Sequence, residues 1–261
     1  MLTDDAMRRA RPWEWDALAR GMAEPQFQDI IARYKREENL EIVSAWAPTR
    51  VKRLLKSDLF EEGFGKDAIL DALAAKYPSA FGMDISHVVA VAASRRIGEA
   101  AYVASDVCDL PYAESVFDLI VSISTLDHLD PPLLPRGLGE LCRVLTPGGC
   151  LILTLDSRHN PLHVLSNNLR WAMGRIHAER CYKVDEVRAA LTGLPVHVTD
   201  ETAIYHVPFP VNFLAKKAEE LVGSRADRLI EAVVRRCQNL ARYRRTRFMT
   251  GRYIALRIVK R

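Results

Sequence analysis

The sequence predicts an α/β protein with a mostly parallel sheet and helices on both faces. First, short apolar segments alternate with amphipathic segments over residues 51–157, as strands and helices do in βαβ units. Second, residues 117–124 (FDLIVSIS) and 150–156 (CLILTLD) are almost continuously apolar, which is typical of parallel strands that are buried on both faces. Third, turn signals such as TPGG at residues 146–149 separate these segments.

Each element follows from local patterning. Residues 1–50 are expected to be helical, because Phe27, Ile31 and Tyr34 recur at helical spacing and Pro48 ends the run. Ser86 is a good N-cap for the helix that follows it. The next expected strands are 50–55, 80–85, 100–106, 117–124 and 150–156, and the helices between them are 65–77, 86–96 and 131–145.

The last hundred residues are less regular. Residues 184–194 predict a helix, 195–207 a strand and 215–243 one or two helices. Residues 251–260 alternate apolar and basic side chains, which predicts a final strand. We therefore divide the chain into an N-terminal helical cap (1–50), a ligand-binding core (51–157), and a substrate-side helical insertion with the final strands that complete the sheet (158–261).

Composition excludes several classes of protein. The chain has 261 residues, 49% of them hydrophobic and 27% charged, and no apolar run is long enough to span a membrane. Its beginning lacks a secretory signal pattern. The five cysteines are scattered without a CxxC pair, so we expect no metal site and a reducing, cytoplasmic location.

The net charge of +4 is unevenly distributed. From Phe213 to the end there are 14 Lys/Arg and 4 Asp/Glu residues, a net of +10. Such a basic segment can face an anionic lipid surface or nucleic acid, or it can be a solvated helix face. We expect at most weak contact with an anionic surface and do not expect nucleic acid as a partner.

Acidic residues follow three successive expected strands. They are Asp58 or Glu61/Glu62 after the first strand, Asp84 after the second and Asp106 after the third. Ligands of open parallel sheets bind at the carboxyl ends of the strands. A carboxylate there can accept both hydroxyls of a ribose, and another can accept from the amino group of an adenine. The pattern favours an adenosine-containing ligand with a positive charge.

Three motifs together resemble the class I S-adenosylmethionine-dependent methyltransferases, in particular their small-molecule type. They are GMDIS (82–86), SDVCDLPYAESVFDLIVSISTLDHL (105–129) and ELCRVLTPGGCLILTLD (140–156). The resemblance implies a Rossmann-like seven-stranded sheet with an antiparallel last strand, and S-adenosylmethionine as cofactor. It implies that Asp84, next to Ile85, holds the ribose, and that Asp106 and the backbone of Val107 read the adenine. It places Ser122 and Ser124 beside the methionine part.

The loop after the first strand departs from the family pattern, and two alignments remain open. In one, Gly63 and Gly65 form the tight turn, since Glu61–Gly65 matches the family's acid-x-Gly-x-Gly sequence. In the other, Lys56-Ser57-Asp58 is the turn and Glu62 approaches the cofactor's amino group. We favour a modified loop in which Asp58 or Glu62 binds the amine and Gly63 allows close approach.

Methyl transfer to a hydroxyl is helped by a general base. His128 lies just past the fourth strand, histidine is a common general base, and Asp127 can orient it. His206 is a further candidate, and Asp156, His159 and Asn160 are second-rank candidates. Trp13, Trp15, Trp171 and Phe209 can supply apolar walls for the acceptor.

The sequence thus predicts an enzyme that methylates a small or lipid-like molecule, at oxygen, by in-line transfer with a His/Asp base. Alternatives are an RNA or protein methyltransferase that docks through the basic C-terminal segment, and a non-catalytic binding or scaffold protein of the same fold. An aminopropyl transferase is disfavoured, because the acid pattern expected for a polyamine is absent.

Overall fold

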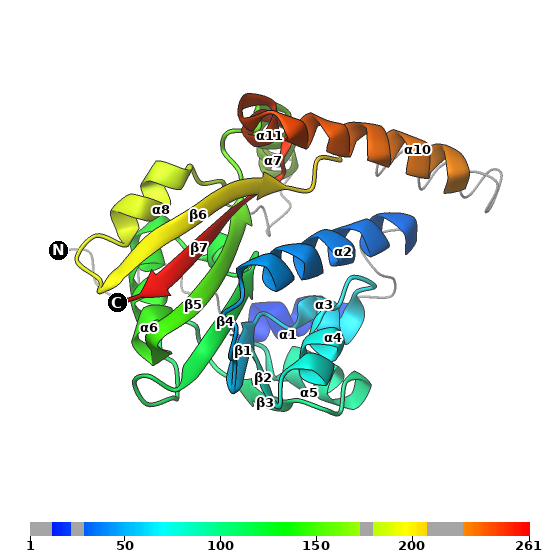
Figure 1. Ribbon diagram of the computed structural model, residues 1–261. Helices are drawn as coiled ribbons and strands as arrows, with labels where there is room; N and C mark the ends of the chain where they lie inside the picture. Colours follow the sequence, from blue (N-terminus) through cyan, green and yellow to red (C-terminus); the bar gives the residue numbers. More distant parts are fainter. Residues whose placement is uncertain (1–11, 22–28, 173–179, 208–226) are drawn as a thin grey trace.

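The computed structural model describes residues 12–21, 29–172, 180–207 and 227–261 (Figure 1). Its strands are β1 (Arg53–Ser57), β2 (Ser79–Asp84), β3 (Ala101–Ala104), β4 (Phe117–Ile123), β5 (Leu145–Asp156), β6 (Val196–Ile204) and β7 (Tyr253–Lys260). They form one seven-stranded sheet in the order β3-β2-β1-β4-β5-β7-β6. Strand β7 is antiparallel to β5 and β6, and the pairs among β1 to β5 are parallel. The predicted fold class, with its antiparallel last strand, is confirmed.

The helices cover both faces of the sheet. They are α1 (Pro12–Gly21), α2 (Asp29–Trp46), α3 (Phe60–Phe64), α4 (Leu70–Lys76), α5 (His87–Arg96), α6 (Leu134–Val144), α7 (Pro161–Ala172), α8 (Val184–Ala190), α10 (Asp227–Gln238) and α11 (Arg244–Thr250), with short 3-10 turns η2 (Leu126–His128), η3 (Pro131–Leu133) and η5 (Asn239–Arg242). None of the helices within the described ranges is both long and apolar enough to cross a bilayer.

Alternating strand residues face two separate apolar cores. Leu55 and Ile120 pack with α6 and α8 on one face of the sheet, while Leu54 and Leu119 pack with α2, α4 and α5 on the other. This follows from the period of two along a strand. Helix α2 is thus part of the covering layer of the sheet, although it belongs to the segment that the sequence predicts as a cap.

A third, smaller core joins α2 to the C-terminal part of the chain. Ile31 and Tyr34 of α2 pack with Ile230 and Val234 of α10, and the hydroxyl of Tyr34 donates to Glu231 at 3.3 Å. Figure 1 shows α10 running beside α2 and extending past the edge of the sheet.

Most predicted elements are found, with shifted bounds. The helix expected from residue 86 is confirmed, and the Ser86 hydroxyl caps it by accepting from the Val89 N–H at 3.1 Å. The helix expected at 65–77 is shorter, because α4 begins only at Leu70. The turn expected at 146–149 lies inside β5, where pairing with β4 shifts register and Gly148 adopts a φ of +75°.

Candidate active site

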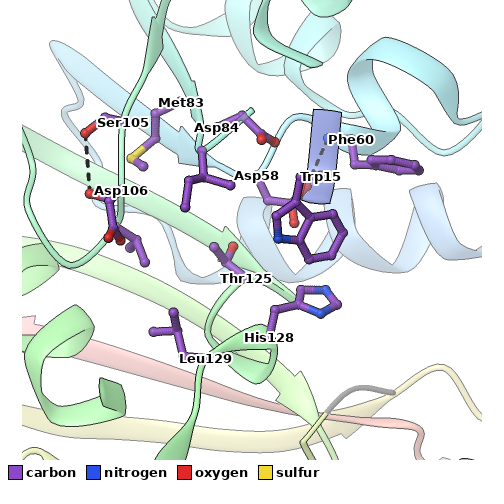
Figure 2. Close-up of a pocket in the computed structure, with 12 residues that line it drawn as sticks. Trp15, Asp58, Phe60, Met83, Asp84, Ser105, Asp106, Thr125, His128 and Leu129 are labelled. Carbon is purple, nitrogen blue, oxygen red and sulfur yellow. Dashed lines mark hydrogen bonds between the residues drawn. The ribbon is translucent and has the colours of Figure 1, made fainter. Parts of the chain in front are cut away.

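A cleft lies at the carboxyl ends of β1, β2, β3 and β4, where the strand order reverses between β1 and β4. This is the position at which open α/β sheets bind ligands. Its volume, with the part open to solvent included, is about 520 Å³. Three carboxylates border it, those of Asp58, Asp84 and Asp106 (Figure 2).

The loop after β1 turns at Asp58, which has a left-handed backbone conformation with a φ of +67°. Aspartate tolerates this conformation better than most residues because its short side chain bonds locally. Here its carboxylate accepts from the Phe60 N–H at 2.9 Å. The ammonium of Lys56 donates to the Asp58 carbonyl and pairs with Glu62 at 3.0 Å. A buried ion pair, rather than a glycine pair, therefore holds the turn.

Gly63 and Gly65 do not form this turn. Residues 60–64 form α3, and Gly65 is its C-cap. A Cβ at Gly63 would lie 3.1 Å from the Cβ of Ala92 in α5, so Gly63 allows two helices to pack closely. The Glu62 side chain is fully buried and accepts from Lys56 and from the Ile69 N–H. The structure places Lys56 and Ser57 in β1 and the turn at Asp58, and Glu62 does not border the cleft.

Asp84 ends β2 and is nearly buried, with 8% of its surface exposed. One carboxylate oxygen accepts from the Leu59 N–H and the other from the Ser86 N–H, both at 2.8 Å. Burial, followed by the nearby charge of Asp58, raises the pKa of Asp84 to about 7. A cation bound in the cleft would favour the ionised form.

Asp106 and Val107 follow β3 on another side of the cleft. The Asp106 carboxylate accepts from the Cys108 N–H at 2.8 Å, which fixes the turn. Within the described residues, no group accepts from the backbone N–H of Val107. Met83 supplies apolar surface beside Asp84 and Asp106 (Figure 2), and Ile85 also lines the cleft.

His128 and Thr125 come from the segment after β4 and face Asp58 and Asp84 across the cleft (Figure 2). The His128 ring lies edge-on to Trp15 with 4.8 Å between ring centroids. The Thr125 hydroxyl is 2.9 Å from that of Ser57. Trp15 belongs to α1, so the N-terminal helix contributes one wall of the cleft, as the sequence suggests for this residue.

Comparison with known proteins identifies the chain's family. The family described as "Methyltransferase domain" matches residues 60–153. A malonyl-[acyl-carrier protein] O-methyltransferase of Geobacter sulfurreducens is 33% identical over 186 residues, which cover 62% of this chain and 68% of that protein. The chain belongs to the class I S-adenosylmethionine-dependent methyltransferases. The family resemblance drawn from the sequence is thereby confirmed, and S-adenosylmethionine is the cofactor.

Solved structures share the fold of this methyltransferase at low sequence identity. A geranyl diphosphate C-methyltransferase from Streptomyces coelicolor, in complex with S-adenosyl-L-homocysteine, has a TM-score of 0.59 and 13% identity, over 94% of this chain and 88% of that one. The [4+2]-cyclase SpnF has a TM-score of 0.55 and 19% identity, over 86% and 80%. Proteins with different reactions thus have this fold, so the reaction must be argued from the site.

The cleft of this methyltransferase fits its cofactor. The cofactor has a ribose diol, an adenine, and positive charges on its sulfur and amino group. Among the described residues that line the cleft, three are carboxylates and none is lysine or arginine, so the cleft favours a cation. Met83, Ile85 and Val107 offer an apolar surface to a flat ring.

The remaining predicted site residues are not in the cleft lining. The Asp127 carboxylate is buried beside the N–H of Asp156, at 3.3 Å. His206 is buried, and its two ring nitrogens lie 2.8 Å from the Thr250 hydroxyl and 3.2 Å from the Ala203 carbonyl. Burial lowers the pKa of His206. The other predicted residues outside the lining are Lys56, Glu62 and Gly63 in the first loop and Ser122 and Ser124 at the end of β4.

The second-rank candidates Asp156, His159 and Asn160 do not line the cleft. The Asp156 carboxylate lies 2.5 Å from the His163 ring nitrogen. Although burial opposes ionisation, the close contact with His163 and the charge of Arg252 lower the pKa of Asp156. Sequence reasoning did not select His163, although it lies four residues after His159. Asn160 donates to the Thr250 carbonyl at 3.0 Å. Phe209 lies outside the described residues, as does the side chain of Trp171.

Sequence reasoning also missed five residues that line the cleft. Their common feature is that each adjoins a residue that the sequence predicts for the site. Phe60, Met83, Ser105, Thr125 and Leu129 are these residues.

Proposed function

We propose that this methyltransferase methylates an oxygen of a small or lipid-like acceptor, with His128 as the general base. The position of His128 carries the proposal. It borders the cleft opposite Asp58 and Asp84, beside the apolar surfaces of Trp15 and Leu129. The malonyl-[acyl-carrier protein] O-methyltransferase relative supports oxygen as the methylated atom.

Three carboxylates hold the cofactor in this proposal. Asp84 accepts hydrogen bonds from the ribose hydroxyls, since each of its oxygens has a lone pair beyond the one used by Leu59 or Ser86. Asp106 accepts from the adenine amino group, and the Val107 N–H donates to a ring nitrogen. Asp58 faces the amino group, because Glu62 is engaged with Lys56.

When bound, the cofactor would supply a methyl group on a positively charged sulfur, and this sulfur would keep the electron pair of the broken bond. His128 takes the acceptor's hydroxyl proton as the oxygen–carbon bond forms. Trp15 holds the His128 ring by its edge-on contact. The apolar walls position the acceptor in line with the carbon–sulfur bond and exclude water.

A methylation assay tests the proposal. The full chain is incubated with S-adenosylmethionine and a panel of phenols, carboxylic acids and lipid-like hydroxyls, and the methylated product is detected by mass spectrometry. His128→Asn should lower kcat by about 10²–10⁴-fold without changing the cofactor Kd. His197→Asn, which changes an exposed histidine of β6, should leave both unchanged. An unchanged kcat in His128→Asn would exclude His128 as the general base.

The altered first loop supports a second candidate, a protein that binds the cofactor without transferring its methyl group. The turn at Asp58 is held by a buried Lys56–Glu62 pair in place of the family's glycines. The [4+2]-cyclase with the same fold is a precedent for a different reaction. Cofactor binding with no product from any acceptor in the panel would favour this candidate.

A further inference from the structure

Helix α7 has an exposed apolar stripe. Leu162, Leu165 and Leu169 are spaced three and four residues apart, so they lie on one face of the helix. They are 65%, 66% and 59% exposed. Large apolar side chains gathered on one helix face indicate an interaction surface more often than scattered ones do. Helix α7 has no acidic residue.

The neighbouring surface is basic. Helix α7 begins against the end of α11, where Asn160 donates to the Thr250 carbonyl at 3.0 Å and the His159 ring lies 5.6 Å from that of Phe248. Helix α11 also lacks acidic residues. Arg245 lies in α11 and Arg242 lies just before it in η5. Both are exposed and have no carboxylate partner within the described part of the chain. Tyr243 between them is 73% exposed.

This surface lies at the same edge of the sheet as the cleft. Helix α7 follows the carboxyl end of β5, which neighbours β4. Helix α11 precedes β7, whose antiparallel direction places its start at that same edge. Figure 1 shows α7 and α11 together there.

We propose that this leucine–arginine face, formed by Leu162, Leu165, Leu169, Arg242, Tyr243 and Arg245, docks on an anionic lipid surface. Exposed leucines beside unpaired arginines are the combination with which interfacial helices bind anionic bilayers. The arginines contact the headgroups and the leucines enter the boundary with the acyl chains. This inference goes beyond the proposed methylation, and it places the cleft next to a source of lipid-like acceptors.

Vesicle co-sedimentation of the full chain tests the inference without measuring activity. Binding to phosphatidylcholine vesicles that contain phosphatidylglycerol should exceed binding to phosphatidylcholine alone, and added salt should weaken it. Arg242→Gln with Arg245→Gln should lower the affinity about fivefold per arginine. Arg50→Gln with Arg53→Gln removes the same charge near the amino end of β1 and should have no effect.

The leucine variant decides between a membrane and other partners. Leu162→Gln, Leu165→Gln and Leu169→Gln together keep good helix formers in α7 and should lower vesicle affinity more than about tenfold. No binding to anionic vesicles, or binding that this variant retains, would overturn the proposal. So would a dimer in sedimentation velocity that the leucine variant abolishes, because the face would then belong to a second copy. The arginine pair keeps the test valid if the leucine variant fails to fold.

Discussion

At the scale of single residues, the proposed contact of Asp84 with the cofactor should make cofactor binding depend on pH. Burial and the charge of Asp58 raise its pKa to about 7, so near pH 6 most free protein has a protonated Asp84. The positively charged cofactor favours the ionised carboxylate, and binding should therefore release a proton below pH 7. We expect the affinity for S-adenosylmethionine to rise from pH 6 to pH 8 and then to level off.

Calorimetry in buffers of different ionisation enthalpy measures both the affinity and the proton released. Asp84→Asn cannot ionise, so it should bind more weakly and with little change between pH 6 and pH 8. Equal affinity of the native chain at both pH values would show that Asp84 is already ionised, or that it does not contact the cofactor.

At the scale of elements, a carboxylate of helix α1 helps to attach this helix beside the cleft. Asp16 accepts from the Ser86 hydroxyl and, at 3.3 Å, from the Val88 N–H at the start of α5. The Ser86 N–H in turn donates to Asp84. Since Trp15 is the neighbour of Asp16 and lines the cleft, we expect the attachment of α1 to hold the wall of the cleft that Trp15 forms.

Asp16→Ala should therefore loosen α1 and weaken cofactor binding. Loss of a hydrogen bond costs about 0.5–1.5 kcal/mol, which corresponds to roughly a 2–13-fold higher Kd for S-adenosylhomocysteine. Stopped-flow tryptophan fluorescence measures the dissociation rate, which should increase. Glu14→Ala changes an exposed acid of the same helix and serves as the control. Equal dissociation rates in the two variants would show that the Asp16 contact of α1 does not affect cofactor binding.

Elements that depend on local patterning could be predicted from the sequence, and elements that depend on tertiary contacts could not. The apolar strands and the Ser86 cap follow from nearby residues alone. The segment 61–65 matches a cofactor loop by its letters but forms part of α3, because Glu62 is buried against Lys56 and Gly63 packs on α5. Neither contact produces a periodic signal in the sequence.

At the scale of the whole molecule, one part of the candidate site could be predicted from the sequence, whereas the other part depends on tertiary contacts. The acids after β1, β2 and β3 meet in one cleft because parallel strands end at one edge, and their order along the chain was enough to predict this. The place of Trp15 depends on α1 docking against α5, about 70 residues away in sequence. His206 was predicted to reach into the site from the late segment of the chain, but its ring lies against the Thr250 hydroxyl.

A buried charge cluster makes the stability of the whole molecule depend on pH. Lys35 of α2 pairs with Asp67 at 2.7 Å and with Glu61 at 3.2 Å. Burial raises the pKa of Glu61 to about 8, and the neighbouring Asp67 adds to the rise against the opposing charge of Lys35. Between pH 4.5, the ordinary value, and pH 8, folded Glu61 holds a proton that the unfolded chain releases. The contribution of Glu61 to stability is therefore full at low pH and is lost as the pH rises through this window.

Glu61→Gln cannot ionise in either state, so it should remove this contribution. We expect the free energy of unfolding of the native chain, relative to Glu61→Gln, to fall by about 1 kcal/mol between pH 6 and pH 8, a modest value because 23% of the Glu61 side chain is exposed. The lowered pKa of Asp67 acts below this window. Urea unfolding at both pH values measures the difference, and Glu37→Gln, at an exposed acid of α2, is the control. A difference that stays constant, or that rises with pH, would mean that Glu61 is ionised in the folded chain and that Lys35 is neutralised by two carboxylates.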